Sequence, residues 1–327
     1  MLEEVFSRRK VVTPQELRWL NERSDLMGGL QMLSHLGLVA AICVGHYMVM
    51  GTWWVLLTGF MLGVSLNFLY AGQHELSHWT VFRTKWLNEW FGRFIGFFMF
   101  FPRDFDLIMH YSHHRCTQDW SGDGELVRKP YTLSTYLLWM IGLSYWRNRF
   151  LGIIRRASGI IIEPYIHDNE KAKVIMESRI HILGYIIIAG ASFWFARWEA
   201  LTFWVLPMLL CKPVHQLQNT IEHLGLSHEH DIMNNTRSTR TNFIMRWLCW
   251  QMPYHTAHHS FPSVPFWKLK ALNNKIETNV GPVHRMGWIE FQIAVLKKLW
   301  SKDESQYPSN EVWVVPKKNG GHFTLEA

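Results

Sequence analysis

Four long apolar stretches divide the chain and are expected to form membrane-spanning helices. They run over residues 30–50, 52–72, 180–198 and 200–214. A helix needs about 20 predominantly apolar residues to cross a hydrocarbon core of roughly 30 Å. Only Gly51 separates the first two stretches, and only Glu199 separates the last two. The pattern therefore predicts two helical hairpins, each of which crosses the membrane and returns.

Two shorter apolar stretches lie between the hairpins and are not expected to span. Residues 90–101 are too few to cross a bilayer and favour an interfacial or buried helix. Residues 131–146 are bordered by Arg128, Lys129 and Arg147, and a span there would need a further helix to restore the topology. This second stretch is therefore interpreted as interfacial.

Positive charge is concentrated away from the turns of the predicted hairpins. The chain has 33 Lys and Arg against 26 Asp and Glu, which gives a net charge of +7. Five of these cations precede residue 30, fourteen lie between residues 73 and 179, and twelve follow residue 223, whereas Arg197 lies at a hairpin turn. Because cationic loops stay cytoplasmic, both termini and the segment between the hairpins are predicted in the cytoplasm. The host membrane would be a bacterial inner membrane or the endoplasmic reticulum.

Composition narrows the class of protein further. Aromatic residues make up 15% of the chain, including 18 Trp, and such rings favour the membrane interface. The four Cys are widely spaced and indicate neither a disulfide framework nor a zinc knuckle. No nucleic-acid-binding motif accompanies the basic charge, and no cleavable signal peptide is expected. We predict an N-terminal cytoplasmic segment (1–29), a membrane domain (30–300) and a polar C-terminal tail (301–327).

Eight of the 18 histidines fall in three compact boxes that are far apart in the chain. Residues 74–78 read HELSH, residues 110–114 read HYSHH, and residues 255–259 read HTAHH. A fourth motif, NTIEH at residues 219–223, ends in another histidine. Side chains three or four residues apart share one face of a helix, and imidazole is the most common metal ligand. The boxes therefore predict one metal centre assembled from distant segments.

Nine histidines and one asparagine are too many ligands for one ion. Tetrahedral zinc takes four ligands, whereas two metals with four or five nitrogens each would account for the set. Imidazole-rich sites with open positions suit iron and oxygen chemistry. Nearby carboxylates are expected to accept hydrogen bonds from ligating imidazoles. The candidates are Asp104, Asp106, Asp119, Asp123, Glu125 and Glu222, from which Asp119 and Glu222 are selected.

Two other classes of protein can be weighed against this interpretation. The first box also fits H-E-x-x-H, the zinc metalloprotease motif in which Glu75 would be the general base. That interpretation leaves most of the box histidines without a role. A metal-binding transporter would place its site at mid-bilayer, whereas these boxes lie beyond the ends of the predicted spans. Within the fourth motif, His228 and His230 are alternatives to His223, and His215 is a candidate for lining the site.

The boxes resemble those of the membrane fatty acid desaturase and hydroxylase superfamily, which are integral-membrane diiron enzymes. The resemblance covers about residues 30–272 and includes HHRCTQD at 113–119 and MPYHTAHHSFPSVP at 252–265. It implies an all-α membrane protein with four transmembrane helices in two hairpins and a cytoplasmic helical cap that carries the metal site. It also implies that Asn219 binds iron through water. The implied direct ligands are His74, His78, His110, His113, His114, His223, His255, His258 and His259.

The resemblance also implies an activity. Two irons would activate dioxygen, and an apolar chain, expected to be a fatty acyl or lipid chain, would be desaturated or hydroxylated. No fused cytochrome b5 or rubredoxin region is recognisable, so we expect a separate electron donor of the ferredoxin, rubredoxin or cytochrome b5 type with its reductase. The HxxxH first box favours acyl-lipid desaturases or hydroxylases, whereas residues 219–226 resemble the NxxEHxGL motif of alkane hydroxylases. Desaturation is slightly favoured by its frequency in the superfamily.

Overall fold

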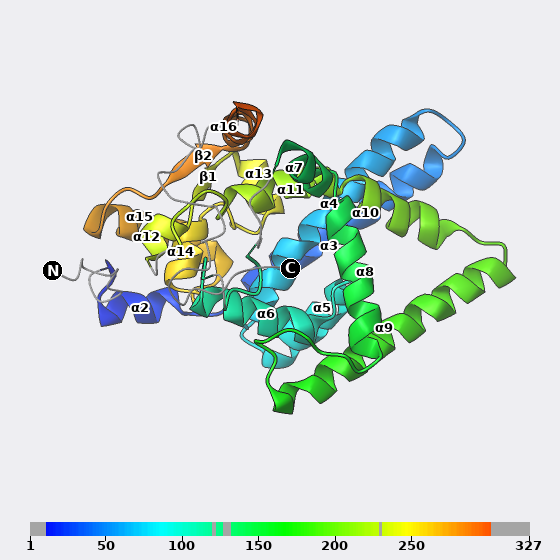
Figure 1. Cartoon of the computed structure of the whole chain (residues 1–327), viewed down its shortest axis with the longest axis horizontal. Coiled ribbons are helices and arrows are strands. Elements are labelled where there is room, and N and C mark those ends of the chain that lie inside the picture. The colour runs from blue at the N-terminus through cyan, green and yellow to red at the C-terminus, as the bar shows by residue number, and fades with distance from the viewer. Residues whose placement is uncertain (1–10, 120–121, 127–131, 229–230, 302–327) are drawn as a thin grey trace. The chain divides into compact units, whose positions relative to one another are not determined.

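The computed structural model describes residues 11–119, 122–126, 132–228 and 231–301, and helices dominate these residues (Figure 1). The chain divides into two compact units, each built from separated segments. The hairpin unit comprises Ser24–Ile108 and Leu138–Gln216. The histidine unit comprises Met1–Arg23, Met109–Leu137 and Leu217–Ala327. The chain passes between the units within α6 (Arg103–Arg115), α7 (Leu133–Met140) and α11 (Lys212–Ile221).

Three described helices of the hairpin unit are long and apolar enough to cross a membrane. They are α3 (Asp25–Met48), α4 (Trp54–Ser77) and α9 (Asp168–Trp194). They cover most of the first three predicted stretches, although α9 begins well before residue 180. Its polar first turns are helical because a capping box between His167 and Glu170 begins the helix there.

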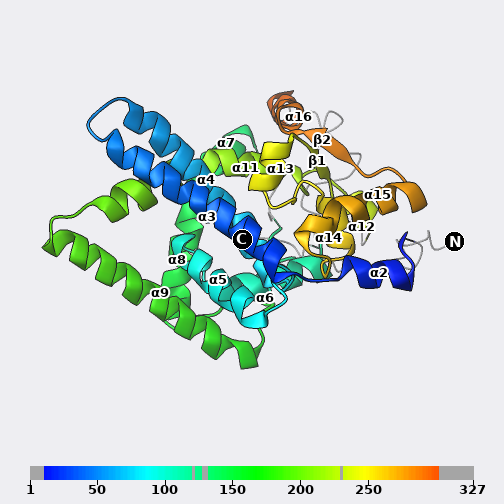
Figure 2. The same cartoon turned by 180° about the vertical axis from the view of Figure 1, so that it is seen from behind.

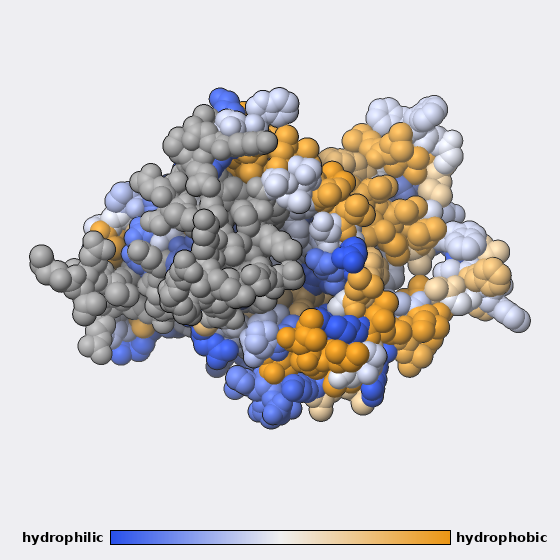
Figure 3. Space-filling model, viewed as in Figure 1, coloured by the Kyte–Doolittle hydropathy of each residue, from blue (hydrophilic) through white to orange (hydrophobic). Residues whose placement is uncertain are grey.

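Helices α3 and α4 lie side by side in the hairpin unit (Figure 2). Two histidines of α3 bond to α4: His35 Nε2 lies 3.0 Å from the carbonyl oxygen of Ser65, and His46 Nδ1 lies 2.8 Å from Oγ1 of Thr58. Polar groups in a span need such internal partners because hydrocarbon offers none. The outer surface of this pair is mostly hydrophobic (Figure 3).

The fourth apolar stretch is not one continuous helix. A π-helix at Leu201–Val205 runs into α10 (Leu206–Leu210), and α11 begins at Lys212 after Cys211. Pro207 cannot donate a backbone hydrogen bond, and a wider π turn precedes it. Where α10 ends, Asn67 of α4 donates from Nδ2 to the carbonyl oxygen of Met208 at 2.9 Å. The segment is shorter than a spanning helix, so the fourth span stays a prediction.

The two stretches interpreted as interfacial fold as short helices. Helix α5 (Lys85–Phe98) exposes Trp86, Trp90 and Phe94 at a spacing of four residues, as an amphipathic interfacial helix would. Residues 131–146 are divided between α7 and α8 (Leu143–Ala157), because Gly142 adopts a left-handed conformation with φ of +80°. This break prevents residues 131–146 from forming a continuous spanning helix.

The histidine unit adds one short pair of strands to the mostly helical fold that was expected. Strands β1 (Ser238–Arg240) and β2 (Arg285–Gly287) pair in parallel, with Thr239 opposite Met286. Strands of three residues are too short to show the alternating pattern that predicts a strand. The other described elements of this unit are α2 (Pro14–Leu20), α12 (Ile232–Asn235), α13 (Phe243–Leu248), α14 (His255–Ser260), the 3₁₀ turn Phe266–Lys268, α15 (Leu269–Asn279) and α16 (Trp288–Ser301).

Candidate metal centre

The second and third histidine boxes lie on short helices, as their spacing predicts. Helix α6 follows Pro102 and carries Asp104 and Asp106 in its first turn, where carboxylates stabilise the helix dipole. The second box occupies the last turns of this helix. Helix α14 carries the third box and ends before Phe261 and Pro262. The histidines of the third box are buried, and so are His110 and His113.

Four histidines of the histidine unit form one compact group, called the lower group here: His113, His223, His255 and His259. One nitrogen from each lies within 4.8 Å of the others. The Nε2 atoms of His223 and His255 are 2.7 Å apart, and the ring centroids of His113 and His259 are 4.9 Å apart. This group combines the second box, the third box and the NxxxH motif.

The remaining box histidines of this unit form a second group, called the upper group here: His110, His114 and His258. Nε2 of His114 lies 3.0 Å from Nε2 of His110 and 3.1 Å from Nε2 of His258. The neighbours His113 and His114 thus belong to different groups. Adjacent residues point about 100° apart on a helix, so one helix can supply imidazoles to two metals.

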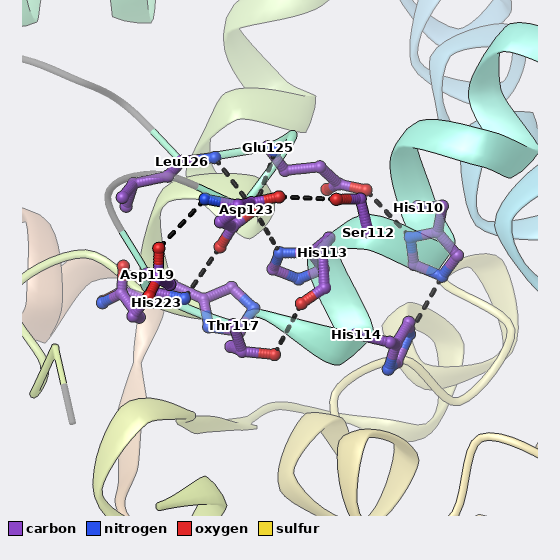
Figure 4. Close-up of polar contacts among 12 residues, drawn as sticks. His110, Ser112, His113, His114, Thr117, Asp119, Asp123, Glu125, Leu126 and His223 are labelled. Carbon is purple, nitrogen blue, oxygen red and sulfur yellow. Dashed lines mark hydrogen bonds and ion pairs between the residues drawn. The ribbon is translucent and has the colours of Figure 1, made fainter. Parts of the chain in front are cut away.

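In several of these rings, Nδ1 makes a hydrogen bond to a carboxylate or carbonyl oxygen (Figure 4). Nδ1 of His110 lies 2.8 Å from Oε1 of Glu125, and Nδ1 of His113 lies 2.8 Å from Oδ1 of Asp123. Nδ1 of His223 lies 2.9 Å from the carbonyl oxygen of Asn235. Carbonyl and carboxylate oxygens accept hydrogen bonds, so each Nδ1 carries the proton. The Nε2 lone pair of each ring then remains available for a metal.

His259 reaches the same tautomer through a hydroxyl group. Thr117 Oγ1 donates to the carbonyl oxygen of His113 at 2.8 Å, so its lone pair can accept from Nδ1 of His259 at 3.3 Å. Nε2 of His259 is buried and has no hydrogen-bond partner among the described residues. A buried polar atom without a partner is costly, and a metal ion would satisfy this one. The donor set therefore fits a metal.

The electrostatics of the unit also fit bound cations. Burial lowers the pKa of His223 and of His258 to about 3 and lowers that of His259 well below its usual value. Neutral imidazole is the form that binds metal. Burial also opposes a charge on His113, but Asp123 and then Glu125 raise its pKa to about 9. The carboxylates thus favour positive charge at the lower group.

The first box lies in the hairpin unit. His74 is in the last turn of α4, His78 caps that helix, and their ring centroids are 5.5 Å apart. Both side chains are buried. Tyr70 makes edge contacts with His74 and with His215, whose Nδ1 lies 3.0 Å from Nζ of Lys212. His215 is therefore linked to the first box through Tyr70.

The selected carboxylates have different roles in the structure. Oε1 of Glu222 lies 3.6 Å from Nδ1 of His255, close to the ring it was expected to support. Oδ1 of Asp119 accepts from the backbone N–H of Gly122, the residue before Asp123, at 3.0 Å. Whether these carboxylates support bound metal stays a prediction. The sequence identified Asp123 and Glu125 as candidates but could not pair them with rings.

The other residues of the fourth motif lie around this centre. Asn219 is half-buried on α11, four residues before His223, and no hydrogen bond of its side chain to a histidine is observed within the described residues. Nδ1 of His228 lies 2.9 Å from the carbonyl oxygen of Gln118, whereas His223 joins the lower group. His230 lies outside the described residues. Thr117 and the carbonyl of Asn235 had no recognisable signal in the sequence.

Comparison of the sequence with known families places the same histidine motifs in one family. The profile of the fatty acid desaturase family matches residues 51–291, which include all four histidine motifs. This chain belongs to the fatty acid desaturase family. Membership in this family favours the desaturase interpretation over a metalloprotease built on the HExxH sequence of the first box.

Desaturases that act on different lipids are similar to this family member. An sn-1 oleoyl-lipid 12-desaturase of Picosynechococcus sp. is 23% identical over 275 residues, which cover 77% of this chain and 78% of that protein. A sphingolipid delta(4)-desaturase/C4-monooxygenase of Rattus norvegicus is 25% identical over 247 residues, covering 70% and 69%. A sphingolipid delta(4)-desaturase DES1-like protein of Oryza sativa subsp. japonica is 23% identical over 220 residues, covering 64% and 61%.

Exchange of Asp123 for asparagine tests the support of the lower group. Asp123→Asn removes the charge that holds Nδ1 of His113, so we expect metal affinity or turnover to fall by about ten- to a hundredfold. Metal titration of purified protein measures the effect. Asp119→Asn is the matched control, because an amide oxygen can still accept from Gly122, and we expect a change within about twofold. Equal losses in both variants would favour the sequence-based choice of Asp119.

Proposed function

We propose that this family member is an O2-dependent diiron oxidoreductase that desaturates an acyl chain of a membrane lipid. One observation carries the proposal: seven imidazoles of the histidine unit, five of them buried, form two adjacent groups. The outer nitrogens of His110, His113 and His223 are held by oxygen acceptors, which leaves the inner nitrogens for metals. Such imidazole-rich sites suit iron and dioxygen.

The lower group would hold one iron through His113, His223, His255 and His259. The upper group would hold the other through His110, His114 and His258, and we propose His74 and His78 as its further ligands, as the box pattern predicts. Asn219 would contribute through a water molecule. When bound, the two irons reduce dioxygen and supply the oxidising power that removes hydrogen from a strong C–H bond.

The residues of this chain prepare the site for that chemistry. Asp123 and Glu125 fix the tautomer and the orientation of the rings they hold, and raise their basicity as ligands. Burial keeps His223 and His258 neutral at physiological pH and excludes bulk water from the centre. A dry site strengthens each electrostatic interaction in it and limits side reactions.

The substrate and the location follow from the apolar helices and from the relatives. Helices α3, α4 and α9 are long and apolar enough to cross a membrane, and an acyl chain is the apolar substrate that a membrane supplies. We propose that the termini and the metal centre lie in the cytoplasm, because the cations flank the predicted hairpins on that side. A separate protein would supply the electrons.

Hydroxylation by the same site is the second candidate. Desaturation and hydroxylation each consume one O2, two electrons and two protons, and release two waters and one water, respectively. Both begin by breaking a C–H bond. The relative from Rattus norvegicus is named for a desaturase and a C4-monooxygenase activity together. Desaturation remains the first candidate because all the relatives described above are named desaturases.

Metal analysis combined with a product assay tests the proposed function. Protein purified in mild detergent from iron-replete cells should contain about two irons per chain. Supplied with O2, a reductant and membrane lipids, it should lower the mass of an acyl chain by two hydrogens, or add one oxygen if it hydroxylates. Removal of iron with a chelator should abolish either product, and iron should restore it. One zinc per chain with no iron would contradict the proposal and favour a hydrolase.

A further inference from the structure

An exposed apolar surface lies on the histidine unit away from the metal groups. Helix α13 begins shortly after β1 and helix α16 directly follows β2, and an ion pair between Arg240 and Glu290 links the segments where the two helices start. Five large hydrophobic side chains on these helices are between 48% and 78% exposed. They are Phe243 and Ile244 of α13 and Ile289, Ile293 and Trp300 of α16, together called the α13–α16 patch here. Large exposed apolar side chains gathered on elements that start from paired strands mark a site for a partner.

A chain of polar contacts leads from this patch to the lower group. Trp288, next to Ile289 in α16, donates from Nε1 to Oε1 of Gln218 at 2.8 Å. Nε2 of Gln218 donates to Oε1 of Glu222 at 2.7 Å, and the same oxygen lies 3.6 Å from Nδ1 of His255. Gln218 and Glu222 are buried, whereas Trp288 is partly exposed. The chain thus connects the surface to a proposed iron ligand.

The surroundings of the patch are basic. Residues 237–250 and 285–301 contain six Lys and Arg and a single carboxylate, Glu290, which pairs with Arg240. Of the six cations, Arg237 and Lys298 are buried, and Arg285 pairs with Glu277 of α15. Arg246 and Lys297 lie at the surface or close to it and, together with the paired Arg240 and Arg285, outnumber the two carboxylates. Such a surface attracts an acidic protein and repels a second copy of itself.

We propose that the α13–α16 patch docks a small acidic one-electron carrier protein of the iron–sulfur or haem class. The proposal rests on the proposed function, in which each turnover needs two electrons. Two reduced carriers bind in succession, each loses one electron, and Trp288, Gln218 and Glu222 connect the carrier to His255. The two protons consumed per turnover come from solvent. The apolar centre of the patch supplies contact area, and the surrounding cations orient the carrier.

Placing a negative charge inside the apolar patch tests whether the carrier docks there. An acidic [2Fe–2S] ferredoxin and cytochrome b5, each kept reduced, serve as carrier probes, and reduced methyl viologen serves as a donor that needs no docking. Ile289→Glu and Ile293→Glu should raise the KM and Kd for the active carrier about tenfold, because they place a charge in the apolar contact. Turnover with methyl viologen and iron content should stay unchanged. Val280→Glu, at an exposed apolar position directly after α15, is the matched control.

Removal of the hydrogen bond from Trp288 to Gln218 tests the proposed connection between the patch and His255. Trp288→Phe keeps an aromatic ring but removes the indole N–H that holds Gln218. Carrier-driven kcat should fall several-fold while the Kd for the carrier and turnover with methyl viologen stay unchanged. A merely structural role would lower turnover with both donors. In the unaltered protein, added salt should raise the Kd for the carrier, since the surface cations steer it.

The outcomes separate this inference from the proposed function. No product with any donor, including methyl viologen, would contradict the proposed function, whereas carrier binding could still be measured directly. Unchanged KM and Kd in both Glu variants would overturn docking at this patch, and so would turnover with methyl viologen but with neither carrier. A change of oligomeric state in Ile289→Glu without a change in the Kd for the carrier would identify the patch as a contact between copies.

Discussion

Replacing His259 with alanine is expected to remove one of the two irons and to lower turnover by about a thousandfold or more. The Nε2 atom of His259 is buried, has no hydrogen-bond partner among the described residues, and lies in a group whose nitrogens are within 4.8 Å of one another. Its Nδ1 proton is directed to Thr117. Its structural role without metal is therefore small, and its loss should act through the metal.

Elemental analysis of the iron content and a product assay of turnover test this expectation. Iron should fall from about two to about one per chain, while membrane insertion and size-exclusion behaviour stay unchanged. His322→Ala is the control, since His322 stands alone in the C-terminal tail outside the described residues, and it should have no effect. Full turnover in His259→Ala would show that the lower group is not a metal site.

Replacing His78 with alanine is expected to remove the other iron. The upper group offers three imidazoles from the histidine unit, whereas a diiron site built from these motifs needs four or five nitrogens per metal. The first box, on the end of α4, is the source of the missing ligands that the sequence pattern predicts. We therefore expect iron to fall to about one per chain in His78→Ala, with a loss of turnover as large as in His259→Ala.

The double variant decides whether the two histidines serve different metals. If His78 and His259 hold separate irons, the losses add, and His78→Ala/His259→Ala should retain close to no iron. If both hold the same iron, the double variant should keep as much iron as either single variant. Two irons in His78→Ala would contradict a role of the first box in metal binding.

The hydrophobic pattern predicted most of the membrane helices but not their continuity. Stretches of about 20 apolar residues predicted α3, α4 and α9, because span length depends on composition alone. The stretch at 200–214 has the same composition, yet Pro207 and the end of α10 before Lys212 interrupt the helix. The parallel pair of β1 and β2 was missed, because three-residue strands far apart in the chain leave no periodic signal.

The spacing of the histidines predicted which side chains would bind metal, but not which carboxylate contacts which ring. A spacing of three or four residues places imidazoles on one helix face wherever the helix lies, and α6 and α14 bear this out. Asp119 is closer to the second box in sequence than Asp123 is. In the structure Asp119 accepts a hydrogen bond from the backbone N–H of Gly122, whereas Asp123 contacts His113, and composition does not reveal such contacts.

The sequence by itself determined the ligand types, their helical faces and the apolar length of the spans, because each depends on residues close together in the chain. Only the tertiary structure decided how the imidazoles of the histidine unit divide into two groups. His113 and His114 are adjacent, yet His113 lies beside His223 and His259, whereas His114 lies beside His258. It also decided the tautomers, since Thr117 and Asn235 meet their rings through contacts that only the fold brings together.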